Sequence, residues 1–238
     1  MAEHAPFIWF SFLPLLSNLP PQVSIALFVL AVLTLLAYLG FRQVASSDPA
    51  EALIPSDRLT LRNIFELLAE AILKFVDDII GPRGREFLPL IGTLGFFILF
   101  SNLLGLVPGF LPPTDNLNTT VACALIVFFA THYYGIKAHG FRYIKHFLGP
   151  VWWLSPLIFI IEIITHLARP LSLSMRLFGN IMADHMLLSM ALLAPSLLVL
   201  LVSPLAMVLG VFVSLIQTFI FILLSTMYIS FAIEEAEH

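Results

Sequence analysis

Charge is what this sequence has least of. Of its 238 residues only 11% are Asp, Glu, Lys or Arg, whereas 60% are hydrophobic, and the mean hydropathy is +1.00. So few charges cannot cover an ordinary water-soluble domain of this length. They sum to −4 and form no basic patch, which argues against nucleic acid as a partner. We therefore expect a protein that crosses a membrane several times.

Reactive motifs are missing as well. Cys123 is the only cysteine, so no internal disulfide can form, and its apolar surroundings are typical of a small core residue. The chain has no HExxH, no CxxC and no glycine-rich phosphate loop. We expect no metal, no cofactor and no enzymatic site in this chain by itself. Glu3 and His4 precede the first apolar segment without any Lys or Arg, so we expect no cleaved signal peptide.

Long apolar runs take the place of charge. About 20 apolar residues form a helix that crosses a hydrocarbon core of about 30 Å. Such runs predict five spans in one membrane domain, at residues 23–41, 87–107, 118–136, 149–195 and 205–233. Residues 1–22 are aromatic and broken by proline, and we expect them to form an external segment. The fold class is an all-α integral membrane protein.

Residues 60–80 predict a helix of another kind. Apolar residues recur every three or four positions from Leu61 to Ile79, and charged residues from Arg62 to Asp78 occupy the opposite face. Gly81 and Pro82 then end the helix. Such a helix could pack within a soluble loop, but spans on both sides favour an amphipathic helix lying on the membrane surface.

Basic residues indicate the orientation of the chain. Six of the eleven Lys and Arg residues lie between Arg42 and Glu86, and Lys137 closes the third span. Because basic loops stay on the cytoplasmic side, we expect the N-terminus outside and the C-terminus in the cytoplasm.

The last two spans predict a long, tilted helix hairpin. A straight helix over residues 149–195 would be about 70 Å long, more than twice the hydrocarbon thickness, so it must tilt or bend, with Pro156 and Pro170 as places to bend. No Asp, Glu, Lys, Arg or His occurs from Met186 to Ile233. The chain therefore turns inside this run, which we expect near Pro195 to Pro204.

The first helix of this hairpin carries ionisable groups that are costly in lipid. A charge at the bilayer centre costs about 2.5–3.5 kcal/mol on insertion scales, so such groups usually face protein or water. Helical projection places one polar stripe on this helix, comprising Glu162, Thr165, Arg169, Ser172, Arg176 and Asn180. His166 and Asp184 project at the edge of the stripe, and His185 projects from nearly the opposite side.

The last helix carries a second stripe, comprising Gly210, Ser214, Gln217, Ser225 and Tyr228. Small residues at helix contacts explain Gly210 and Ser214. The amide of Gln217 needs a polar partner, and we expect Arg176 to approach it. His132, alone in the third span, is more typical of a packing or interface residue than of a proton relay.

Three motifs together resemble one family. The run RPLSLSMRLFGN from Arg169 to Asn180 is similar to the signature of subunit a of the rotary F-type ATP synthases, and NLLGLVPG at Asn102 to Gly109 and IQTFIF at Ile216 to Phe221 extend the resemblance. It implies a stator subunit beside the ring of c subunits, with b-type peripheral stalk subunits, other synthase subunits and membrane lipid as partners. It also implies proton transport in an energy-coupling membrane, most typically a bacterial inner membrane.

The resemblance also implies roles for residues. Arg176 stays protonated, and a fixed positive charge favours the ionised form of a carboxylate brought beside it. The family's carboxylate is on each c subunit, and Arg176 would separate two offset half-channels. The inner path would be lined by Glu162, Thr165 and His166, and the outer path by Asn180, Asp184, His185 and Gln217. Supporting positions are Arg169, Ser172, Ser214 and Tyr228, and snorkelling explains Arg169 equally well.

The sequence departs from the family at one point. Many bacterial members carry Glu at the place of His185 and His at the place of Gly210. Here the acid is Asp184, next to His185, so we expect this pair to replace the usual relay.

Two other functions would fit a polytopic membrane chain. A secondary transporter could bind its substrate at the polar hairpin, but the absence of an internal repeat argues against it. A structural membrane anchor would have no need of Arg176.

Overall fold

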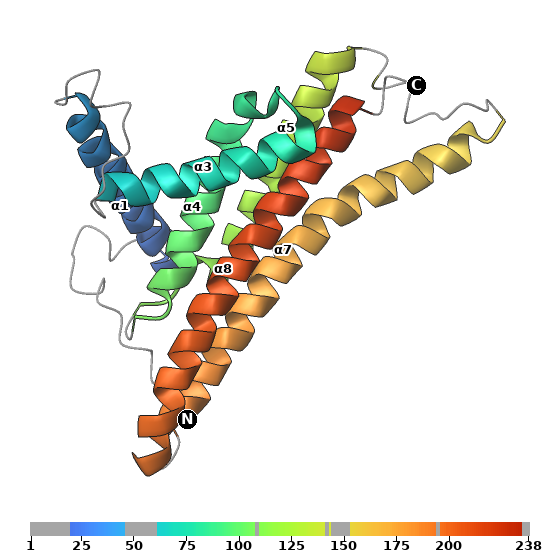
Figure 1. Cartoon of the computed structure of the whole chain (residues 1–238). Coiled ribbons are helices and arrows are strands. Elements are labelled where there is room, and N and C mark those ends of the chain that lie inside the picture. The colour runs from blue at the N-terminus through green and yellow to red at the C-terminus, as the bar shows by residue number, and fades with distance from the viewer. Residues whose placement is uncertain are drawn as a thin grey trace.

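The computed structural model describes residues 20–45, 61–107, 110–140, 143, 153–193 and 196–234. These residues form α-helices joined by turns, and no strand occurs among them (Figure 1). The predicted all-α class is therefore confirmed. The predicted external segment 1–22 lies almost entirely outside the described residues.

Five apolar helices make up the bundle. They are α1 (Pro21–Ala45), α4 (Leu88–Leu104), α5 (Leu117–His139), α7 (Ser155–Leu193) and α8 (Ser196–Glu234). Four of them are long and apolar enough to cross a membrane, and α4 is shorter at 17 residues. At 1.5 Å per residue α4 still measures about 25 Å, near the lower limit for a span.

The helix hairpin differs from the prediction in where its second arm begins. α8 starts at Ser196 rather than at residue 205, and Pro204 lies inside it, as Pro170 lies inside α7. A proline removes one helical hydrogen bond, but a chain in lipid has no water to satisfy the backbone groups that a full break would expose. The helix therefore continues through the proline. Residues 194 and 195, which separate the two helices in the sequence, lie outside the described residues.

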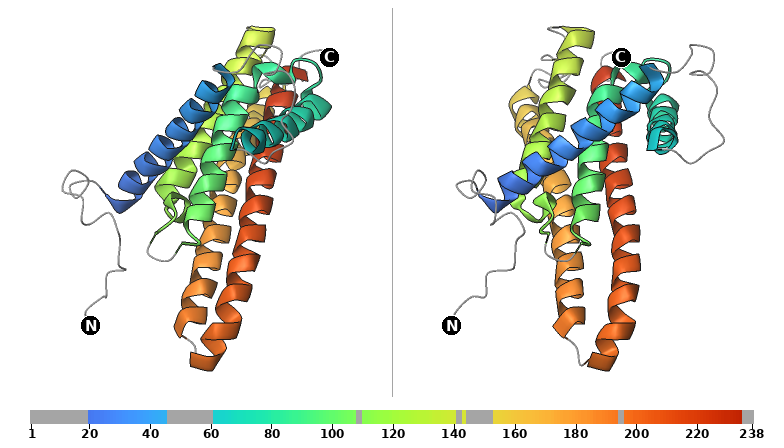
Figure 2. Two further views of the ribbon diagram at one scale, coloured as in Figure 1. Left: turned by 60° about the vertical axis from the view of Figure 1, so that its left-hand side comes forward. Right: turned by 90° about the vertical axis from the view of Figure 1, so that its left-hand side faces the viewer.

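The α7–α8 hairpin is the longest part of the molecule. Its two arms lie side by side and project beyond the other helices at the end away from the C-terminus, as Figure 2 shows. α5 packs against both arms, α4 packs against α8, and α1 packs against α4. Leu177, Ile98 and Phe221 bring α7, α4 and α8 together in the main apolar core.

One glycine brings α4 and α8 close together. A Cβ atom on Gly95 would lie 2.7 Å from Cδ1 of Ile222 on α8, closer than carbon atoms normally approach. Gly95 has only a hydrogen atom in place of a side chain, and this sets the distance between the two helices.

α3 (Leu61–Ile80) crosses the bundle near the end where α5 and α8 terminate (Figures 1 and 2). Phe65 packs against Phe96 and Phe100 of α4, with ring centres 5.3 and 6.1 Å away, and Phe75 packs 5.1 Å from Phe219 of α8. Gly81 ends the helix at a φ of +82°, a conformation that favours glycine. Apolar packing and a crossing direction both support the prediction of a helix lying on the membrane surface.

Two short 3-10 turns connect the helices. η2 (Gly84–Glu86) leads from α3 into α4, and η3 (Pro113–Asp115) precedes α5. At η3 the Thr114 hydroxyl donates to Oδ1 of Asn102 over 2.8 Å, and both side chains are buried. Asn102, near the C-terminal end of α4, thus ties that end of the helix to the connecting loop.

Candidate functional site

The polar stripe of α7 lies along the boundary between its buried and exposed faces. Leu173, Leu177 and Ile181 repeat every four residues and are buried against the bundle. Leu171 and Met175, which are 63% and 51% exposed, project on the opposite side. Of the stripe residues, the exposed ones are Thr165, Ser172, Arg176 and Asn180, and the half-buried ones are Glu162 and Arg169. The hairpin therefore offers a mixed apolar and polar surface to whatever lies beside it.

Arg176 is on this exposed surface. No hydrogen bond or ion pair joins it to another residue in the described part of the chain. Measured along a straight helix, Glu162 is about 21 Å and Asp184 about 12 Å away, in opposite directions. A guanidinium in an apolar segment thus has no counter-charge within the described chain.

Gln217 does not meet Arg176, contrary to our expectation. Its side chain is 2% exposed, and its Oε1 accepts a hydrogen bond from Nδ2 of Asn180. Asn180 follows Arg176 by one helical turn, and the register of the hairpin puts that turn opposite Gln217. This hydrogen bond between two polar side chains joins the two arms of the hairpin.

Asp184 faces α8 at Gly210. A Cβ atom on Gly210 would lie 2.9 Å from Oδ2 of Asp184 and 2.5 Å from Cδ2 of Leu106. The half-buried carboxylate therefore occupies the space that a side chain at position 210 would need. The side chain of His185 lies outside what the structure describes, so its expected pairing with Asp184 stays a prediction.

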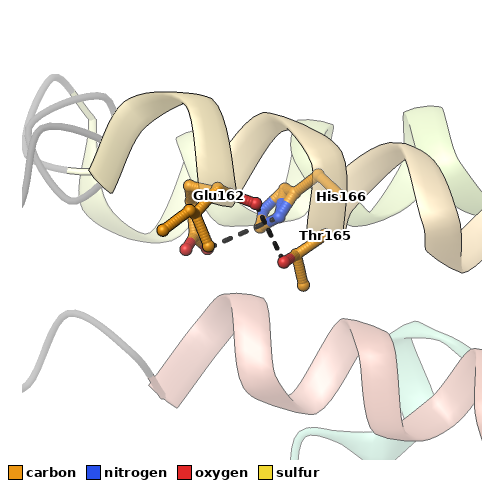
Figure 3. A network of polar contacts seen from close by, with 4 residues as sticks. Glu162, Thr165 and His166 are labelled. Atoms are coloured by element: carbon orange, nitrogen blue, oxygen red, sulfur yellow. Dashed lines mark hydrogen bonds and ion pairs between the residues drawn. The ribbon is translucent and has the colours of Figure 1, made fainter. Parts of the chain in front are cut away.

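A second polar cluster lies toward the start of α7. Nδ1 of His166 is 3.6 Å from Oε1 of Glu162, one turn earlier, and His166 is 6% exposed. The Thr165 hydroxyl donates to the Ile161 carbonyl over 2.9 Å. Figure 3 shows these side chains gathered on adjoining turns of the helix. Glu162 and His166 can hold and exchange a proton, whereas the Thr165 hydroxyl is engaged by its own helix.

Arg169 is not a simple snorkelling residue. Its guanidinium carbon lies 5.5 Å from the ring centre of Tyr228 on α8, which is the geometry of a cation–π contact. Two supporting positions, Arg169 and Tyr228, are thus brought together by the hairpin. The other two are not, because Ser172 is exposed on α7 and Ser214 is 1% exposed on α8.

The sequence favoured a packing or interface role for His132 and did not indicate that it lies beside His166. On α5, its ring centre is 5.3 Å from that of His166, with the rings at 80°. Together with Arg169 and Tyr228 these histidines border a cavity between α5, α7 and α8 with room for about one water molecule. The signal in the sequence is a histidine inside a span. Which helix it faces depends on packing, so the sequence did not indicate its partner.

The described residues include no group of three His, Cys, Asp or Glu side chains placed as metal ligands. What the hairpin holds is a permanent positive charge on an exposed face, with one carboxylate toward each end of α7. Such an arrangement can receive a mobile carboxylate beside Arg176 and exchange protons at two separate depths.

Comparison with known proteins gives a consistent result. The model of the family described as ATP synthase A chain matches residues 23–230. ATP synthase subunit a of Geobacter sulfurreducens is 54% identical over 178 residues, which cover 74% of this chain and 76% of that protein. ATP synthase subunit a 3 of Pelobacter propionicus is 46% identical over 216 residues, covering 90% and 88%. The subunit a of Desulfosudis oleivorans is 49% identical over 209 residues, covering 87% and 86%.

Proposed function

This chain belongs to the ATP synthase A chain family, and from that premise we propose that it is the stator subunit that conducts protons to and from the rotating ring. It is an integral membrane component of the synthase with no catalytic site of its own. Its partners are the c-subunit ring, the b-type stalk subunits and the other subunits of the complex. Its N-terminus faces outside and its C-terminus faces the cytoplasm of a bacterial inner membrane.

The observation that carries this proposal is Arg176, which is exposed and has no hydrogen-bond or ion-pair partner within the described part of the chain. Its guanidinium remains protonated at any working pH, so it cannot itself carry protons. It is a fixed positive charge with which an anion from outside the chain can pair. A ring carboxylate arriving beside it loses its proton, pairs transiently with Arg176 and moves on as the next one arrives.

The polar groups on either side of Arg176 form the two paths. Glu162, Thr165 and His166 line the inner path, at the start of α7. Asn180, Asp184, His185 and Gln217 line the outer path. Because Arg176 lies between the two groups, a proton crosses the membrane only when a carboxylate of the rotating ring carries it from one path to the other. Each elementary charge that crosses releases about 2.3 kcal/mol per 100 mV, so several protons are needed for each ATP.

Asp184 is the acid of the outer path, acting with His185. The place of its carboxylate against Gly210 supports this role, because both arms of the hairpin then border the titratable group. The Asn180–Gln217 hydrogen bond, nearer to Arg176, continues the line of polar groups between Asp184 and the fixed charge. Arg169 and Tyr228 hold the two arms together on the inner side, and Ser172 and Ser214 support the surface around the fixed charge.

The test uses membrane vesicles that contain the whole complex. Wild type and Arg176→Ala are compared by ATP-driven acidification and by passive proton leak, both followed with a pH-sensitive dye. Arg176→Ala should abolish acidification and raise the leak, because nothing then separates the paths. Arg85→Ala, which removes an exposed cation from the loop before α4, is the matched control and should pump normally.

Two other functions would show themselves in the same assay. Unchanged pumping by Arg176→Ala would contradict the proposal and favour a structural anchor. A secondary transporter that binds its substrate at the polar hairpin needs a cavity there, and the cavity between α5, α7 and α8 has room for about one water molecule. Uptake of a solute by the chain in the absence of other subunits would favour that function instead.

A further inference from the structure

His132 lies outside the stripes that define the two paths, yet it contacts one of their members. It is half-buried on α5, about two turns before the cytoplasmic end of that helix. Its ring packs 4.2 Å from Phe128 and 6.0 Å from the buried Tyr143, and the ring of His166 lies 5.3 Å away. Two imidazoles from different helices therefore share one polar site.

Their separation suits proton exchange. An N–H···N bond of about 2.9 Å between two imidazoles places the ring centres about 5 Å apart. The observed distance between the ring centres, 5.3 Å with the rings at 80°, is close to this value. Packing alone would be served as well by any aromatic ring.

The backbone sets the tautomer of His132. Its Nδ1 lies 2.8 Å from the carbonyl oxygen of Phe128, which can only accept a hydrogen bond. In the neutral ring the proton is therefore on Nδ1, and Nε2 is the nitrogen that can take up another. His132 is thus prepared to receive a proton without losing its bond to the helix.

We propose that His132 is a proton-carrying residue of the inner path, in a relay formed by Glu162, His166 and His132. The proposal rests on the function proposed above. In the outward-to-inward direction, protonated Glu162 transfers its proton to Nδ1 of His166, so an O–H bond breaks and an N–H bond forms. The resulting imidazolium gives its Nε2 proton to Nε2 of His132. His132 releases that proton to water on the cytoplasmic side and returns to its neutral form.

The relay closes when His166 gives its Nδ1 proton to water and takes up another on Nε2, which restores its first tautomer with no net gain or loss of protons. The charged and titratable groups around the pair come from all three helices: Glu162 and Arg169 from α7, Tyr228 from α8 and Tyr143 beyond α5.

The test replaces His132 by Phe, which keeps a ring against Phe128 and Tyr143 but has no nitrogen. Vesicles holding the whole complex are assayed for ATP-driven acidification. The same vesicles, stripped of the water-soluble part of the synthase, are assayed for passive proton conduction. His132→Phe should lower both rates by about tenfold at equal amounts of assembled complex, because one proton-transfer group is lost. Tyr133→Phe, on the exposed side of the same helix, is the control.

A double-variant cycle and a pH series separate relay from packing. If both histidines belong to one relay, His132→Phe combined with His166→Phe should conduct no worse than the more affected single variant. His132→Phe should also change how passive conduction varies between about pH 6 and pH 8. A His132→Phe protein that assembles and conducts like wild type overturns the relay.

The two proposals fail in different ways. Normal conduction by His132→Phe together with loss of pumping by Arg176→Ala would leave the stator function standing and remove His132 from the path. Normal pumping by both variants would contradict the stator function itself. Additive losses in the double-variant cycle would mean that the histidines act independently, which also contradicts a shared relay.

Discussion

Arg176 on the apolar helix α7 is unusual because nothing among the described residues balances its charge. Arg176 has no partner among the described residues, whereas Arg169, two turns earlier, lies on the ring of Tyr228. The two cations therefore have different uses. Arg169 is in contact with an aromatic ring of the hairpin, whereas Arg176 lies on its exposed face.

Gly210 provides a sharp test at this scale. Gly210→Ala places a methyl group 2.9 Å from the Asp184 carboxylate and 2.5 Å from Leu106, so the carboxylate must move. We expect ATP-driven acidification to fall severalfold. Gly40→Ala is the control, since nothing lies within 4 Å of its Cβ position on α1. Pumping by Gly210→Ala equal to that of Gly40→Ala would show that the placement of Asp184 is unimportant.

Asp184 itself can be made neutral without changing its shape. Asp184→Asn retains the volume against Gly210 but cannot release or take up a proton. We expect it to abolish proton uptake through the outer path while the complex still assembles, as measured by acidification and by the amount of subunit in the membrane. Wild-type pumping by this variant would remove Asp184 from the path.

The Asn180–Gln217 bond is expected to matter more for the path than for stability. Hydrogen bonds between helices in a membrane contribute about 0.6 kcal/mol on average. Gln217→Leu should therefore lower the free energy of unfolding of the assembled subunit by less than about 1 kcal/mol. Thermal denaturation in detergent measures this change. It should reduce pumping clearly, and a large loss of stability with normal pumping would reverse this assignment.

At the scale of elements, α3 is held by aromatic packing on α4 and α8, and α4 is held against α8 by the absence of a side chain at Gly95. Gly95→Val would insert methyl groups where Ile222 already lies. Overpacking of this kind costs about 1–3 kcal/mol, so we expect a lower melting temperature and less subunit in the membrane. Adding Ile222→Ala should restore both, and failure of this rescue would mean that another contact sets the helix spacing.

For the whole molecule, the expected orientation can be measured at exposed positions. Arg85 precedes α4 and Asn118 begins α5, on opposite sides of a short span. A membrane-impermeant maleimide should label Arg85→Cys only from the cytoplasmic side and Asn118→Cys only from outside. Cys123 is 4% exposed and should not react, so it serves as the internal control. The opposite labelling pattern would contradict the positive-inside reading.

Much of the architecture could be predicted from the sequence because the relevant forces act locally. Apolar runs of sufficient length predict helices, and the position of Arg176 on one stripe of α7 follows from helical periodicity alone. The proline at position 204 could not be interpreted in this way. A proline tends to end a helix in water, whereas a helix in lipid can continue through it, as α8 does at Pro204.

The sequence by itself determined the all-α class, the amphipathic pattern of residues 60–80 and the line of polar residues that contains Arg176. It did so because hydrophobic length and a period of 3.6 residues are properties of neighbouring positions. Only the tertiary structure decided that His132 meets His166, that Asp184 occupies the space at Gly210, and that Gln217 pairs with Asn180 instead of Arg176. These contacts depend on the register and spacing of helices far apart in the chain, which packing sets and periodicity does not.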